Sequence, residues 1–213
     1  MRTVMMISII AIAGGMLLAV HGCGGMRQHP EPVKYYVLHY DPPKPPIAPE
    51  AEREKPAVIH VERLEARAPY TTRHIIYAES PYQRSKYAYH QWMNPPADML
   101  TPLLMRDIES SAIADAVVST PAGKAVTHRV EGTIIDFYEN NEDKRWEAVL
   151  MLRLSLTEID PASRAEKTLF YKTYREVRAL EKNNPHDLAR QMSKAMAAVS
   201  EQFIHDIKTY FPL

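Results

Sequence analysis

The sequence predicts an α+β fold, with a mainly antiparallel sheet and two principal helices packed on one face. The clearest observation is segment 150–157, Leu-Met-Leu-Arg-Leu-Ser-Leu-Thr, in which leucine occupies every second position. This alternation is typical of a strand with one buried face. The second observation is the order of the expected elements, which is strands, helix, three strands and helix. This order favours an α+β layer in which both helices cover one face of the sheet.

Four short segments before the first helix are predicted to be strands because they contain many aromatic and β-branched residues. They are residues 34–40, 57–64, 73–78 and 86–92. The first of them lies between two proline-rich segments, 24–32 and 41–56. Proline runs favour polyproline II and cannot join a central sheet, so we expect both segments to be extended spacer.

The first helix is predicted to begin at Asn94–Asp98. This segment offers a capping residue, prolines for the first turn and an acidic side chain near the positive end of the helix dipole. Pro102 must then lie near the first turns, or the helix must start at Thr101 instead, because a proline in the helix interior removes a backbone hydrogen bond. Aliphatic residues recur at four-residue spacing, which is the pattern of a buried helix face. They are Leu100, Leu104, Ile108 and Ala112.

Two further strands, at 127–138 and 167–177, are predicted on either side of the leucine-rich strand. Polar turns at 139–144 and 160–163 would connect the three strands into an antiparallel meander.

The last helix is predicted to begin at Asn184, which can cap it, with Pro185 in the first turn. Its apolar stripe is narrow and flanked by charged residues, so we expect it to pack on the sheet rather than on a membrane or cofactor. The stripe consists of Leu188, Met192, Ala195, Val199, Phe203, Ile207 and Tyr210.

The N-terminus has the pattern of a secretory signal peptide, with Arg2 before an apolar run over residues 4–20. Cys23, the only cysteine of the chain, follows Val20 and Gly22. This arrangement resembles a bacterial lipoprotein box, in which small residues allow cleavage and the thiol receives a lipid. We therefore expect cleavage before Cys23 and its lipidation. An uncleaved anchor, or an ordinary signal peptide with a chance cysteine, is the alternative.

Three segments follow from this interpretation: a signal peptide at 1–22, a lipidated proline-rich tether at 23–56 and a periplasmic α+β domain at 57–213. The tether would contain one early strand, at about 34–40. Cleavage would leave 213 − 22 = 191 residues with a net charge of 25 − 26 = −1, which gives no support for nucleic-acid binding. A lipidated Cys23 also excludes a disulfide, a zinc–thiolate site and cysteine nucleophile chemistry.

The sequence contains none of the common catalytic motifs. It has no Gly-x-Ser-x-Gly elbow, no His-Glu-x-x-His and no glycine-rich phosphate loop. Five of its seven glycines lie at or before Gly25, and its nine histidines include no pair with metal-ligand spacing. We expect no enzymatic activity, no cofactor and no metal.

The aromatic residues Tyr82, Tyr87, Tyr89 and Trp92 form the candidate partner-binding segment. Tyrosine and tryptophan bury a large area while keeping a polar group, which suits a protein interface or a lipid headgroup. Tyr87 and Tyr89 are two residues apart on a predicted strand, so we expect them to share one face. The alternative is a core role, above all for Trp92 under the first helix.

Two motifs resemble those of the ABC-type transport auxiliary lipoproteins, the family of the PqiC-like proteins. The first is Tyr-Tyr-Val-Leu at 35–38, and the second is Tyr-Ala-Tyr-His-Gln-Trp-Met-Asn-Pro-Pro at 87–96, before the first helix. The order of elements resembles the family over nearly the whole mature chain. Two features depart from its pattern: His90-Gln91 stands where members often have arginine after the aromatic residue, and Pro102 interrupts a helix that is usually regular.

The resemblance implies a non-enzymatic lipoprotein of the outer membrane that faces the periplasm, and Gly24 after the lipidated Cys23 favours that membrane. Its partners would be an MCE-domain protein and the components of an ABC-type transporter, which move phospholipid between the membranes. Homo-oligomerisation stays open. Two other functions also stay open: a structural lipoprotein of a secretion or pilus apparatus, and a stand-alone lipid-binding module with a cavity for an acyl chain.

Overall fold

The computed structural model describes residues 31–44, 57–121 and 125–211. Residues Val33–Leu213 form one compact unit. The expected signal peptide, Cys23 and most of the proline-rich segments lie outside the described residues. The helices are α2 (Pro96–Ser110), the short 3-10 helix η2 (Glu142–Lys144) and α3 (Pro185–Lys208). The strands are β1 (Lys34–Tyr36), β2 (Val58–Val61), β3 (Glu65–Ala66), β4 (His74–Ser80), β5 (Gln83–Trp92), β6 (Ala116–Val118), β7 (His128–Asn140), β8 (Glu147–Ile159) and β9 (Glu166–Ala179).

Strand β7 lies at the centre of the sheet. One of its edges pairs antiparallel with β8 over almost its whole length, and β8 pairs antiparallel with β9. The other edge pairs parallel with β2, β3 and β4 in succession. The predicted meander is therefore confirmed, and the short N-terminal strands make the complete sheet mixed. Alternation of apolar residues specifies which face of a strand is buried but not its direction, so these parallel pairings could not be predicted.

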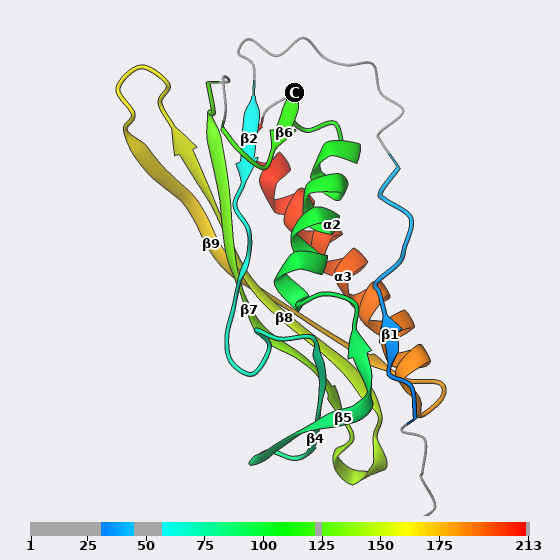
Figure 1. Cartoon of the computed structure of the whole chain (residues 1–213). Helices are drawn as coiled ribbons and strands as arrows, with labels where there is room; N and C mark the ends of the chain where they lie inside the picture. The colour runs from blue at the N-terminus through cyan, green and yellow to red at the C-terminus, as the bar shows by residue number, and fades with distance from the viewer. Residues whose placement is uncertain (1–30, 45–56, 122–124, 212–213) are drawn as a thin grey trace, which may run out of the picture. The chain divides into compact units, whose positions relative to one another are not determined.

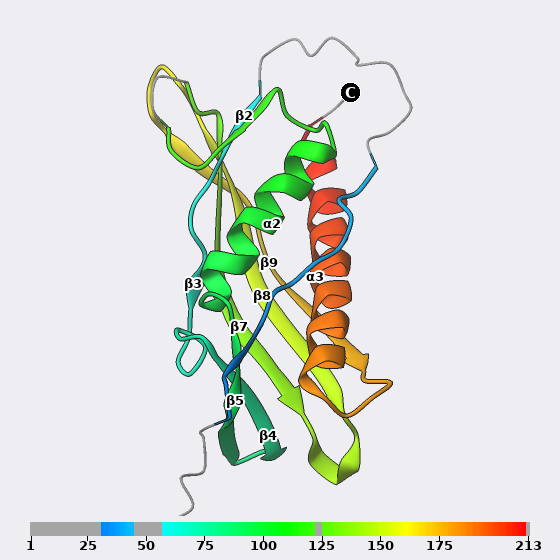
Figure 2. The same ribbon diagram turned by 45° about the vertical axis from the view of Figure 1, so that its right-hand side comes forward.

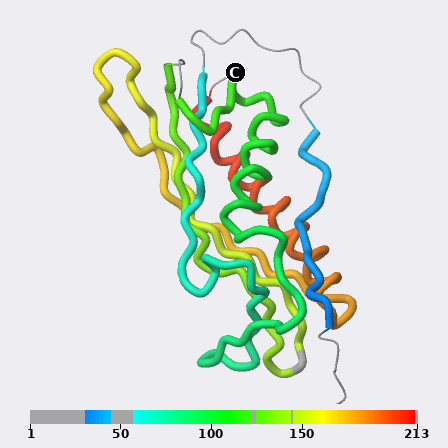
Figure 3. The backbone as a smooth tube through the Cα atoms, viewed as in Figure 1, coloured from blue at the N-terminus to red at the C-terminus, as the bar shows by residue number. Residues whose placement is uncertain are grey.

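Two further strands extend the row from β4. Strands β4 and β5 form an antiparallel hairpin, and β1 adds to β5 in parallel. The strand expected inside the tether is thus part of the compact unit, which begins at Val33. Figures 1 and 3 show β1 beside the N-terminal part of α3. A hydrogen bond joins the segment just after β1 to α3, because the His39 N–H donates to Ser193 Oγ at 3.0 Å.

Helices α2 and α3 cover one face of the sheet, as Figures 1 and 2 show, and the α+β prediction is confirmed. The predicted stripe of α3 is buried against the sheet except for Tyr210, which lies beyond the helix and is partly exposed. Asn184 caps this helix as predicted, since its Oδ1 accepts the Asp187 N–H at 2.9 Å.

The start of α2 differs from the prediction. The helix begins at Pro96, its N-cap is Pro95, and no side chain caps it. A residue before proline is kept out of the helical region, so Asn94 stays outside the first turn. Pro102 lies inside the helix on an exposed position, while Leu100, Leu104 and Ile108 are fully buried. Ala112 falls beyond the last turn, where its φ of 53° has left the helix.

Candidate functional site

The four aromatic residues of the candidate segment lie on one hairpin but not on one surface. Tyr82, in the turn between β4 and β5, is 99% exposed, and Tyr89 on β5 is 44% exposed. Tyr87 is half-buried, and Trp92 is only 1% exposed. The structure therefore leaves Tyr82 and Tyr89 on the surface, while Trp92 has the core position that the sequence left as the alternative.

Tyr87 and Tyr89 do not share a face, contrary to the prediction. The register of the β4–β5 pair shifts between His74 opposite Gln91 and Ile76 opposite Lys86, so β5 contains extra residues there. Such a bulge changes the alternation of side chains along a strand. Tyr87 consequently points to the sheet interior and Tyr89 to solvent, and no sequence pattern marks this shift.

Trp92 is a packing residue beneath the start of α2. Its ring lies 5.1 Å from that of Phe137 on β7, measured between centroids. Its Nε1 is buried, and no hydrogen-bond partner for it occurs among the described residues. The side chain therefore contributes through its apolar area rather than through a polar contact.

A buried carboxylate lies below Tyr87. Glu139, near the end of β7, is fully buried, and Tyr87 Oη donates to its two carboxylate oxygens at 3.1 Å each. Burial raises the pKa of Glu139 to about 7, and the hydrogen bond from Tyr87 only partly opposes the rise. Glu139 was predicted to begin a polar turn. It instead extends β7 and pairs with Tyr77 of β4, so this residue was missed.

Aromatic contacts continue from Tyr87 to the edge strand β1. The Tyr87 ring lies edge-on to His90 at 5.8 Å between centroids. His90 Nδ1 in turn lies 2.8 Å from Tyr36 Oη, at hydrogen-bond distance. Glu139, Tyr87, His90 and Tyr36 thus connect β7, β5 and β1 across the sheet. His90 is one of the residues at which the chain departs from the resembled pattern.

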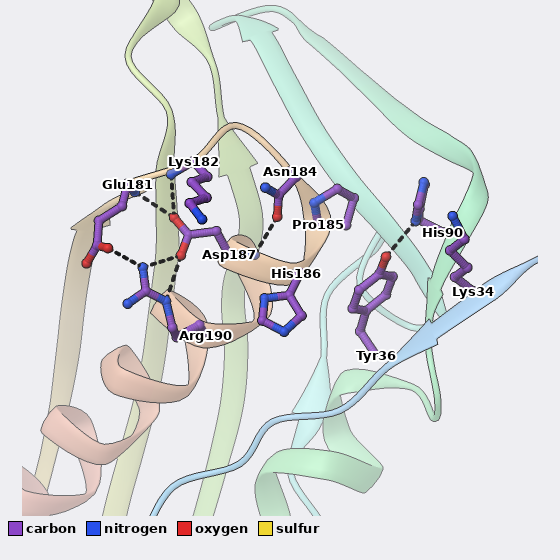
Figure 4. Close-up of a pocket in the computed structure, with 10 residues that line it drawn as sticks. All are labelled: Lys34, Tyr36, His90, Glu181, Lys182, Asn184, Pro185, His186, Asp187 and Arg190. Atoms are coloured by element: carbon purple, nitrogen blue, oxygen red, sulfur yellow. Dashed lines mark hydrogen bonds and ion pairs between the residues drawn. The ribbon is translucent and has the colours of Figure 1, made fainter.

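A cleft of about 640 Å³ lies beside this cluster, between β1 and the start of α3 (Figure 4). Lys34, Tyr36 and His90 line one side of it. The other side is formed by the end of the β9–α3 loop and the first turn of the helix. Its residues there are Glu181, Lys182, Asn184, Pro185, His186, Asp187 and Arg190.

The two carboxylates of the cleft are paired within the protein. Arg190 Nη2 lies 2.7 Å from Glu181 Oε2 and 2.5 Å from Asp187 Oδ1. The guanidinium lowers the pKa of Glu181. Burial alone would raise the pKa of Asp187, but the Lys182 N–H and Arg190 hold it below its ordinary value. Both groups therefore stay ionised, and their contacts hold them at the helix start rather than leaving them available for acid–base work.

The cleft carries a mild positive charge and no reactive set of groups. Three cationic and two acidic side chains line it, so its formal charge is 3 − 2 = +1 with histidine neutral. Across the described ranges, no group of three or more His, Cys, Asp or Glu is placed to hold a metal ion. The arrangement can attract an anionic group, but it offers no nucleophile paired with a base.

A family model described as ABC-type transport auxiliary lipoprotein component matches residues 36–203. The chain belongs to this family. The match covers the second motif, all of the first motif except Tyr35, and every helix and strand from β2 to β9. The comparison with curated proteins found no match to this chain. In the part of the chain that the structure describes, no helix has the length and apolar character needed to cross a bilayer.

Two solved structures share the fold of the auxiliary lipoprotein. Protein XCC0632 from Xanthomonas campestris, a DUF330 protein, has a TM-score of 0.67 and 16% identity, over 80% of this chain and 92% of that one. An uncharacterized protein has a TM-score of 0.62 and 14% identity, over 83% of this chain and 99% of that one. At these identities the likeness establishes the fold alone.

Replacing Trp92 should separate a packing role from an interface role. We expect Trp92→Ala to lower the free energy of unfolding by about 3–5 kcal/mol, because it leaves a large cavity. Trp92→Phe should cost much less, since it retains an aromatic ring and loses no hydrogen bond. Urea unfolding measures both, with Tyr82→Ala as the exposed control, for which a change within about 0.5 kcal/mol is expected. A Trp92→Ala loss as small as that of the control would contradict the core assignment.

Glu139 should make stability depend on pH near neutrality. The unfolded chain releases this proton near the ordinary pKa of 4.5 and the folded chain near 7. The folded state therefore binds more protons between these values, and stability falls as the pH rises through them. From about pH 5 to about pH 8, wild type should lose on the order of 2–3 kcal/mol more than Glu139→Gln in urea titrations. Equal losses in the two proteins would show that Glu139 ionises normally.

Proposed function

We propose that this chain is a membrane-anchored auxiliary lipoprotein that docks the periplasmic MCE-domain component of an ABC-type transport system at the outer membrane. Phospholipid trafficking between the membranes would be the process it serves, and its own role would be non-enzymatic. The observation that carries the proposal is the family match over residues 36–203, which lies after the predicted signal peptide at 1–22 and Cys23. The fold, with its paired carboxylates and unreactive cleft, is compatible with a docking role.

The position of β1 shortens the tether that the sequence predicted. The compact unit begins at Val33, only ten residues after Cys23. Ten residues span at most about 36 Å, because a fully extended chain advances at most about 3.6 Å per residue. A tether of 23–56 free of the sheet would reach on the order of 100 Å. A lipidated Cys23 would therefore hold the folded domain close to its membrane, and the transporter's periplasmic part would have to extend to it.

The exposed tyrosines of the hairpin are the proposed docking residues. Tyr82 projects from the turn between β4 and β5 with nearly its whole side chain in solvent. An aromatic side chain presented in this way can bury a large area in a partner's pocket at low entropic cost. Tyr89 is a second candidate. Tyr87 would act indirectly by holding the hairpin on Glu139, and Trp92 by supporting it from the core.

The two alternative functions have less support. A stand-alone lipid carrier needs an apolar cavity for an acyl chain, whereas the cleft beside α3 is lined by lysine, histidine, arginine and carboxylate side chains. A structural role in a secretion or pilus apparatus finds no support in the family description, which names ABC-type transport.

A pull-down from membranes tests the proposal. Tagged full-length protein should recover an MCE-domain protein and ABC-type components, identified by mass spectrometry, and Cys23→Ser should recover less of both. Tyr82→Ser should reduce recovery by about fivefold or more, as expected for loss of an interface anchor worth about 1 kcal/mol or more. Tyr171→Ser, which removes a tyrosine that is 66% exposed on β9, is the matched control and should behave as wild type. Recovery of a different envelope complex would contradict the proposal.

A further inference from the structure

Exposed apolar side chains gather at one edge of the sheet. Eight large hydrophobic side chains are exposed in the described residues, and five of them lie on or beside β1, or in and just after the C-terminal part of β5. Their exposed fractions range from 37% to 54%. We call this set the β1–β5 apolar surface. It consists of Val33, Tyr35, Val37, Tyr89 and Met93.

The five side chains share one face because of strand periodicity. Val33, Tyr35 and Val37 occupy alternate positions and are exposed, whereas Tyr36 is half-buried and Leu38 is buried on the opposite face. In the parallel β1–β5 pair, Tyr35 lies opposite Gln91. The alternate neighbours of Gln91 along β5 are Tyr89 and Met93, so both lie on the face of Tyr35. The buried Trp92 occupies the opposite face.

Cationic side chains flank this surface. The guanidinium of Arg73 lies 5.8 Å from the centre of the Tyr35 ring. Lys86 is exposed on β5 itself, whereas Lys34 lies opposite His90 and lines the cleft on the other face. Tyrosines with an apolar ring and a polar hydroxyl, bordered by basic residues, are typical of protein surfaces at the headgroup level of a membrane. Basic residues there also gain from attraction to anionic lipid.

The surface begins where the tether ends. Val33 is its first residue, and Cys23 is ten residues earlier, within about 36 Å of chain even when fully extended. An anchor this close in sequence keeps the surface at a high effective concentration near the bilayer. Even a weak contact between the surface and lipid is then populated. No other described surface combines exposed apolar residues with this closeness in sequence to the anchor.

We propose that the β1–β5 apolar surface lies against the lipid headgroups of the bilayer that holds Cys23. The inference rests on the proposed function in one respect, the lipidation of Cys23. The lipid anchor alone holds the chain at a single residue, Cys23, whereas this second contact fixes how the domain is oriented on the membrane. Tyr89 then faces lipid, and Tyr82 at the tip of the hairpin is the tyrosine left for the transport partner.

Site-specific fluorescence on the full lipidated chain tests this. Once Cys23 carries lipid, the chain has no other thiol, so Val37→Cys provides a single site for an NBD label. The matched control is Tyr171→Cys on β9, the strand at the far side of the meander. Met93→Cys is a second label site in case the first variant folds poorly, and circular dichroism checks all three. The proteins are placed in phosphatidylethanolamine–phosphatidylglycerol vesicles with or without doxyl-labelled lipid.

Doxyl lipid should quench NBD at residues 37 and 93 by about twofold or more, and NBD at residue 171 hardly at all, because such quenching needs contact with the headgroup and upper acyl region. Iodide in the buffer should quench NBD at residue 171 more strongly than NBD at residues 37 and 93. Two results would overturn the inference. The first is equal quenching by iodide of NBD at residue 37 and at residue 171. The second is shielding of NBD at residue 37 from both quenchers, which would mean that protein, such as a second copy of the chain, covers the surface.

The lipid anchor is measured separately in the same samples. Intact mass reports the lipid on Cys23, and flotation with vesicles reports anchoring. A chain that carries lipid and floats, yet shows no doxyl quenching, overturns the membrane-facing surface alone. A chain that lacks lipid overturns the anchoring on which the proposed function depends.

Discussion

Pairing along both edges of β7 is the constraint on which the rest of the structure depends. Strand β8 occupies one edge and brings β9 with it, and β2, β3 and β4 share the other. The hairpin partner β5 is held through β4, and β1 through β5. A strand paired on both sides leaves no exposed backbone edge in the middle of the sheet, so the two helices can cover a continuous apolar face. The buried Glu139 lies at the point where β4 meets β7, under the hairpin that carries the exposed Tyr82.

Much of this fold could be predicted because its signals are local. The alternating leucines of 150–157 and the cap at Asn184 each need only a short window of sequence, and both were correct. Long-range features were not accessible in this way. The parallel attachment of β1 to β5 depends on residues more than fifty positions apart, and β3 has only two residues, too few to show a period.

The candidate site was predicted in part. The strand at 86–92 and Tyr82 as a candidate contact residue were predicted, but the pairing of β4 with β5 and the bulge that separates Tyr87 from Tyr89 leave no mark in composition. Glu139 looked like a turn residue because it begins an acidic and polar run. Its burial arises only because β4 and β8 pair with β7 on either side of it. Patterns in a single sequence predict which residues are able to be buried. The pairing of the strands then decides which of these residues are buried in the fold.

The account of function depends most on β1, the last strand in the row that starts at β7. If β1 is held in the sheet, the proposed lipid anchor at Cys23 would keep the domain near its membrane and would present Tyr35 and Val37 toward it. Hydrogen–deuterium exchange on the full-length lipidated protein tests this most directly. A peptide covering 34–39 should exchange at least about tenfold more slowly than the residues before Val33, because the β1–β5 bonds and the bond from His39 N to Ser193 must open first. Equal, unprotected exchange in both segments would show that β1 belongs to the tether and would contradict the account.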